Sequence, residues 1–192
     1  MNGKTFDVQS IVAGLLRPSA AGGTRATLLV RLAVGGVFVS SGAVKLLFEN
    51  QGAGRFAKIG LPDPAHLATF VGAIEIVCGA LIVVGLFARL SALPLVVDML
   101  VAIATTKVPL LVGPGPEPVA AAPKVGFWAF AYQARLDSAM LLGCVFLVAT
   151  GAGLWSLDAW RAKRREAASA KDAVGNEGSS EGPAEGPEAV TT

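Results

Sequence analysis

Five ionisable residues interrupt stretches of this 192-residue sequence that are otherwise apolar: Arg31, Lys45, Glu75, Asp98 and Asp137. Each lies in an apolar run of about 20 residues, the length with which a helix crosses a bilayer. A charge in that setting costs about 2.5–3.5 kcal/mol even on a lenient insertion scale, so we expect these side chains to face a bundle interior and to pair. Such groups either fix helix register as ion pairs or line a proton path or a polar pocket for a small redox molecule. The residue types alone leave both uses open.

The charges fall at two depths if each apolar stretch is a helix. At ~1.5 Å per residue, Asp98 lies ~13 Å and Glu75 ~18 Å from the inner ends of their helices. Arg31, ~6 Å from the inner end of its helix, can extend its side chain toward both carboxyl groups. We therefore predict an inner group formed by Arg31, Glu75 and Asp98.

Two further charges lie near the outer boundary of the predicted bundle. Lys45 and Asp137 are both ~27 Å from the inner ends of their helices, which predicts an outer ion pair between the first and fourth helices. Arg135, two residues before Asp137, could make this place receptive to an anionic or quinone head group. Lys107 lies on a different side of the third helix from Asp98, and we predict that it extends to the outer surface.

The sequence carries no motif of a self-contained redox centre. Cys78 and Cys144 belong to no CxxC pair, and His66 has no metal ligand at a suitable spacing, so we predict no metal site. Cysteines in apolar helices behave as small hydrophobic residues. There is no flavin or nicotinamide fingerprint and no pair of haem ligands, and we expect no covalently bound cofactor. Whether the chain is an enzyme stays open; in a redox reaction it would need a borrowed or diffusible cofactor.

Four apolar stretches of spanning length must position these charges. Hydrophobic residues make up 53% of the chain and charged residues only 16%, a composition typical of membrane proteins. We predict an all-α polytopic membrane protein, an antiparallel bundle of four transmembrane helices in contact with the lipid bilayer. The predicted spans are Thr27–Leu47, Ala65–Phe87, Leu90–Val112 and Leu136–Trp155.

Polar segments flank the predicted membrane domain, residues 27–160. Residues 1–26 carry apolar side chains at helical spacing, which indicates an amphipathic helix on the membrane surface. Residues 161–192 begin with a basic cluster and continue as an Ala/Glu/Gly/Ser/Pro-rich segment, which we predict to be disordered. The Arg161–Arg165 cluster directly behind the last span predicts that both termini are cytoplasmic in a bacterial plasma membrane. The basic residues form no stripe with interleaved aromatics, so we expect no nucleic-acid partner.

Charged and small residues recur in a characteristic order over about residues 25–160. The most specific part of this order is the closing run G-A-G-x-x-S-L-D that follows the fourth span. The positions are Arg31, Gly35, Phe38, Gly42, Lys45, Glu75, Gly79, Gly85, Arg89, Arg135, Leu136, Asp137, Gly151, Gly153, Ser156 and Asp158. In this order, and placed on four helices, they resemble the DoxX family of small integral membrane proteins.

The resemblance implies a membrane protein tied to redox metabolism, because the family takes its name from a subunit of a thiosulfate:quinone oxidoreductase. It implies an accessory or quinone-interacting subunit of a membrane redox complex, with soluble or peripheral redox enzymes as partners. Two other classes stay open. One is a small-solute or proton-coupled carrier. Pro94, four residues before Asp98, suits it because a proline locally frees backbone carbonyls in the third helix. The other is a structural assembly factor. The sequence also leaves open whether the chain forms a homo-oligomer.

Overall fold

A computed structural model describes residues 25–116 and 123–178, and this part of the chain contains helices and no strand. Four helices are long and apolar enough to cross a membrane: Thr27–Leu47, Pro64–Val84, Ala88–Leu111 and Phe127–Thr150. The predicted class, a four-helix polytopic membrane protein, is therefore confirmed. The predicted amphipathic helix near the N-terminus lies outside the described residues. The helices are α2 (Thr27–Leu47), α3 (Ala53–Ile59), α4 (Pro64–Val84), α5 (Ala88–Ala102), η1 (Ile103–Lys107), η2 (Val108–Leu111), α6 (Phe127–Thr150) and α7 (Leu157–Gly178).

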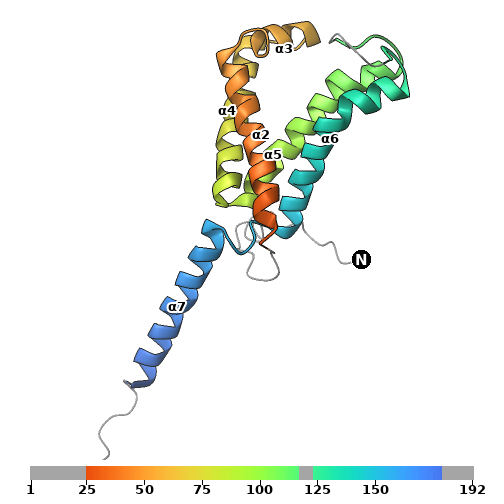
Figure 1. Cartoon of the computed structure of the whole chain (residues 1–192). Helices are drawn as coiled ribbons and strands as arrows, with labels where there is room; N and C mark the ends of the chain where they lie inside the picture. Colours follow the sequence, from red (N-terminus) through yellow and green to blue (C-terminus); the bar gives the residue numbers. More distant parts are fainter. Residues whose placement is uncertain (1–24, 117–122, 179–192) are drawn as a thin grey trace, which may run out of the picture.

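The bundle consists of two helix pairs (Figure 1). Helices α2 and α4 pack along their length, and α5 packs on α6. The two pairs meet at the end where α7 begins and diverge toward the end that carries α3. We refer to these as the α7 end and the α3 end. Outward-facing side chains of all four spans are large and apolar, as contact with a bilayer requires.

Glycines allow the close packing of α2 on α4. A Cβ atom added at Gly35 would lie 2.6 Å from the carbonyl oxygen of Gly79, and one at Gly42 would lie 2.5 Å from that of Gly72. Real Cβ atoms do not approach oxygens so closely, so only glycine permits this separation of the two backbones. Small residues are the usual device for helix association in membranes, where apolar burial between helices gives little driving force.

The turn between α4 and α5 is short because two residues adopt the left-handed conformation. Gly85 has φ 75° and Phe87 has φ 49°. The amide nitrogens of Gly85 and Leu86 both bond to the carbonyl oxygen of Leu81, at 2.9 Å each. Glycine after a helix is the usual C-terminal cap in this conformation. The turn delivers α5 antiparallel to α4 and brings Gly85 to the α7 end.

Several predicted boundaries differ from the structure. The fourth span begins at Phe127 rather than Leu136 and ends at Thr150, because the last proline before it is Pro123 and the chain can become helical directly after Gly126. The second span is Pro64–Val84 rather than Ala65–Phe87. In the third span, α5 gives way to a π-helical turn, η1, and a 3-10 turn, η2. A short helix, α3, lies between the first and second spans.

The segment behind the fourth span is helical rather than disordered. Helix α7 covers Leu157–Gly178 and leads away from the bundle (Figure 1). The prediction of a disordered tail from residue 161 was therefore wrong as far as Gly178. The prediction was based on composition, which shows that the segment cannot bury a core. Its Ala, Arg, Lys and Glu residues are nevertheless good helix formers. Residues 179–192 lie outside the described part.

Candidate functional site

Arg31 is the centre of a polar cluster at the α7 end. Its side chain is almost fully buried, with the residue 2% exposed. The guanidinium donates hydrogen bonds to the carbonyl oxygens of Ile82 (2.9 Å) and Val83 (2.5 Å) at the end of α4. It also donates to those of Ala152 (3.0 Å) and Trp155 (2.7 Å) in the connection from α6 to α7. Carbonyls at helix ends lack intrahelical partners, so Arg31 satisfies acceptors that a bilayer could not.

The residues of the closing G-A-G-x-x-S-L-D run surround this arginine. Gly85 touches it, since a Cβ there would lie 2.6 Å from the guanidinium carbon. The Asp158 amide donates to the Gly85 carbonyl oxygen at 3.1 Å. Ser156 Oγ donates to the Gly153 carbonyl oxygen (2.7 Å) and accepts from the Ala159 amide (3.1 Å), which caps the start of α7. Motif positions that are far apart in the sequence thus build one structural junction.

The junction explains why the predicted inner group does not form. Arg31 was expected to reach Glu75 and Asp98, but its side chain points toward the α7 end, where backbone carbonyls take its donors. Arg89 also belongs to this end, where it donates to the Ala149 carbonyl oxygen at 3.2 Å. The positions of charged residues in the sequence do not reveal these contacts, because every residue type has a backbone carbonyl that can accept a hydrogen bond.

A cavity of about 520 Å³ lies on the other side of the bundle interior, toward the α3 end. Residues of α2, α4 and α5 form its walls, and α3 lies against it at one end. Most of the lining is apolar, for example Val71 and Ile74. Phe70 of α4 and Val97 of α5 also line it while being 61% and 60% exposed. The cavity therefore borders the lipid-facing surface of α4 and α5.

The polar part of the cavity wall includes an ion pair and a second carboxyl group. Lys45 Nζ lies 2.5 Å from Glu75 Oε2, and Glu75 is 0% exposed. Asp98 lines the cavity with this pair, and its carboxyl group interacts electrostatically with that of Glu75. Within the described residues, no hydrogen-bond donor reaches Glu75 Oε1 or Asp98 Oδ2, although both atoms are buried. Unsatisfied buried oxygens cost about 1–3 kcal/mol each, so this arrangement is destabilising.

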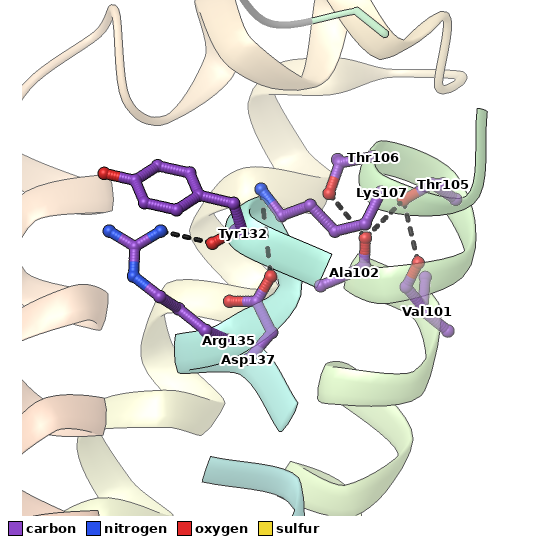
Figure 2. Close-up of polar contacts among 8 residues, drawn as sticks. All are labelled: Val101, Ala102, Thr105, Thr106, Lys107, Tyr132, Arg135 and Asp137. Carbon is purple, nitrogen blue, oxygen red and sulfur yellow. Dashed lines mark hydrogen bonds and ion pairs between the residues drawn. The ribbon is translucent and has the colours of Figure 1, made fainter. Parts of the chain in front are cut away.

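The predicted outer pair of Lys45 with Asp137 is replaced by two other pairs. Lys45 turns to Glu75, which the glycine-mediated contact of α2 and α4 brings beside it. Asp137 faces Lys107, with Oδ2 and Nζ 3.8 Å apart (Figure 2). The prediction that Lys107 extends to the outer surface was also wrong, since the residue is buried. Asp137 and Lys45 both line the cavity without forming the predicted pair.

The π-helical turn η1 accounts for the position of Lys107. One extra residue in a turn rotates the side chains that follow it, which changes the helical phase from which Lys107 was judged to face outward. Thr105 and Thr106 lie in this turn, and their hydroxyls donate to the carbonyl oxygens of Val101 (2.8 Å) and Ala102 (2.6 Å) (Figure 2). The wide turn is thereby stabilised. No periodicity in the sequence signals it.

Arg135 does not join the charged cavity wall. Its guanidinium lies over the Tyr132 ring, 3.9 Å from the ring centroid, and bonds to the Tyr132 carbonyl oxygen. The side chain therefore lies back along α6 rather than toward Asp137 (Figure 2). Cys78 and Cys144 are free thiols. Within residues 25–116 and 123–178 no three His, Cys, Asp or Glu side chains are grouped to hold a metal ion.

The comparisons with known proteins agree with this architecture. The sequence profile of the DoxX family matches residues 26–108. An uncharacterized membrane protein of Mycobacterium tuberculosis is 42% identical over 152 residues, which cover 79% of this chain and 90% of that protein. The chain belongs to the DoxX family. No solved structure matches it. As a member of this family, the chain is an integral membrane protein whose helices contact the lipid bilayer.

Proposed function

We propose that this DoxX protein is an accessory subunit of a membrane redox complex and that it holds a quinone head group in the cavity. The observation that carries this proposal is the cavity itself, which combines apolar walls, a charged end and a border on the lipid-facing surface. Quinones are amphiphiles that reside in the bilayer, so an apolar approach through α4 and α5 and a polar end for the head group suit them. Binding sites with apolar walls and few placed polar groups are typical of small ligands.

The chain's own residues would bind the head group and exchange protons with it. Lys45 could donate a hydrogen bond to one ring oxygen, and Glu75 and Asp98 could accept or return protons. The chain offers no redox cofactor motif, so the electrons would come from or go to a partner enzyme that carries its own cofactor. We place that partner in the cytoplasm, on the side of α7, because the basic residues of α7 follow the fourth span directly.

The test compares two equal substitutions on the same helix. Val71 lines the cavity, whereas Val77 is 57% exposed on α4 and lies outside it. The protein would be purified in mild detergent, its lipid extract analysed for quinones by mass spectrometry, and its affinity for a short-chain quinone measured by titration. We expect quinone in the unmodified protein and in Val77→Trp, and its loss in Val71→Trp, where the indole fills the cavity. Absence of quinone and of binding in the unmodified protein would contradict the proposal.

A second candidate is a proton-coupled carrier, favoured by the broken course of the third span. Pro94 lies on the cavity wall, and the π turn follows Asp98 on the same helix. Interrupted helices beside buried carboxyl groups are a feature of transporters. The same purification separates the two candidates. Redox enzymes that co-purify in stoichiometric amount support the first, whereas a lone protein that moves solute across liposome membranes supports the second.

A further inference from the structure

We infer that the cavity selects the reduced, hydrogen-bond-donating form of its ligand, a hydroquinone, over the oxidised quinone. The inference rests on the proposed function and adds which redox form of the ligand the site prefers. It follows from a count of which hydrogen-bonding atoms on the cavity wall are already engaged and which are left over. A hydroquinone carries two O–H donors, whereas the ring oxygens of a quinone can only accept.

The side chains on the wall that carry donors already have contacts within the protein. Lys45 Nζ bonds to Glu75 Oε2 at 2.5 Å. The hydroxyls of Thr105 and Thr106 donate to carbonyl oxygens one turn earlier in the same helix. Arg55, at the α3 end of the cavity, also has a partner of its own. Lys45 keeps N–H groups beyond this one bond, and a ring oxygen of either the quinone or the hydroquinone could accept from them, so the donors do not distinguish the two forms.

The acceptors on the wall are in surplus. Glu75, Asp98 and Asp137 all line the cavity. Glu75 Oε1 and Asp98 Oδ2 are buried and receive no hydrogen bond from the described residues, and the two carboxyl groups approach each other. Two carboxylates in contact repel unless a hydrogen lies between them or beside them. A hydroquinone O–H would supply that hydrogen, and a hydrogen bond from a hydroxyl to a carboxylate is among the stronger kinds.

The oxidised ligand cannot satisfy these acceptors. Its carbonyl oxygens carry no hydrogen to donate, so they would leave the carboxylate oxygens unsatisfied. Since a hydrogen bond to a charged group contributes roughly one to two powers of ten in affinity, we expect the hydroquinone to bind at least about tenfold more tightly.

A preference of this kind acts on the redox equilibrium of the bound ligand. Quinone takes up two electrons and two protons to form hydroquinone, and a site that favours the product raises the midpoint potential of the bound couple. A tenfold preference corresponds to about 30 mV for two electrons. The reaction that supplies this site is then a two-electron reduction of quinone by a partner enzyme, whose product the chain retains in the bilayer.

The experiment measures three affinities on the full chain in lipid nanodiscs under anaerobic conditions. The probes are a short-chain benzohydroquinone, the matching quinone, and the dimethyl ether of the hydroquinone, which has the same shape but no O–H donor. We expect the hydroquinone to bind at least about tenfold more tightly than either of the others. In Glu75→Gln and Asp98→Asn the carboxamide brings its own N–H donors, and the preference should fall toward equality. Asp63→Asn, an exposed acid outside the cavity, is the control and should keep it.

Each outcome bears on a separate statement. Equal binding of quinone and hydroquinone, or tighter binding of quinone, would overturn the selectivity and leave the quinone site intact. Binding of the dimethyl ether as tight as that of the hydroquinone would also overturn it, because shape alone would then explain the affinity. If none of the probes binds, both the proposed function and this inference are contradicted. If a variant fails to fold, the comparison of hydroquinone with its ether on the unmodified protein still decides the question.

Discussion

The two ends of the bundle both bury charge, but they treat it differently. At the α7 end, Arg31 places its donors on four carbonyl oxygens, and the helix ends around it are closed by hydrogen bonds. Toward the α3 end, Lys45 serves Glu75, while Asp98 Oδ2 and Glu75 Oε1 receive no donor from the described residues. The helices converge at the first end, and the second holds a cavity.

The difference teaches that burial of a charge does not by itself indicate a function in a membrane protein. Arg31 is more deeply buried than Lys45, yet every nitrogen of its guanidinium donates a hydrogen bond, and its role is to join α2, α4 and the start of α7. The carboxyl pair has incomplete contacts beside a cavity, and a ligand could complete them. Hydrogen-bond satisfaction, rather than burial, separates the structural end from the candidate binding end.

The largest expected effect is the removal of Arg31. Arg31→Ala removes the donor from the carbonyl oxygens of Val83, Ala152 and Trp155. Each buried oxygen left without a donor costs about 1–3 kcal/mol, so we expect a loss of at least about 3 kcal/mol in the free energy of unfolding. Thermal or denaturant unfolding in detergent would measure it. Arg25→Ala is the control, since Arg25 lies at the same end but only contacts the Trp155 ring at 5.5 Å. Equal stability of the two variants would mean that the junction is not structural.

The next effect concerns the packing that brings Lys45 beside Glu75. Gly42→Ala places a Cβ 2.5 Å from the Gly72 carbonyl oxygen, so α2 and α4 must move apart. We expect a loss of about 1–3 kcal/mol, the usual cost of overpacking. Gly36 is the matched control, because a Cβ there meets nothing within 4 Å. A Gly42→Ala variant as stable as Gly36→Ala would show that the close approach is unnecessary.

A smaller effect tests which charges pair toward the α3 end. A double-mutant cycle of Lys45→Met and Glu75→Gln should give a coupling energy of about 1–3 kcal/mol, because the two groups are 2.5 Å apart. The cycle of Lys45→Met with Asp137→Asn should give less than about 0.5 kcal/mol. Unfolding measurements on the five variants and the unmodified protein provide both numbers. A larger coupling for the second cycle would restore the pair that the sequence suggests.

The smallest effect is expected at α7. Its residues 163–169 are exposed in the structure, and the helix leads away from the bundle. A chain that ends at Ala168 should therefore unfold within about 0.5 kcal/mol of the full chain. The comparison of midpoints in one denaturation series is sufficient. A clear loss of stability would mean that α7 packs on the bundle or on a second copy.

The sequence by itself determined the number, class and approximate limits of the membrane helices. A single apolar segment of this length crosses a bilayer as an α-helix, because its backbone groups must form their hydrogen bonds within the segment. It also singled out Gly35 and Gly42 of α2 and four charged residues that line the site: Lys45, Glu75, Asp98 and Asp137. These inferences depend on composition and on helical phase, both of which are local properties of the chain.

Only the tertiary structure decided how the charges pair. Arg31 bonds to carbonyls of segments 51 to 124 residues away, and any residue type can supply a carbonyl oxygen. The π turn before Val108 changed the phase of Lys107 and gave Asp137 a partner. Lys45 pairs with Glu75 because glycines let α2 and α4 approach each other closely. Depth and phase limit which charges can meet, but helix separation and a single extra residue in a turn determine which ones do.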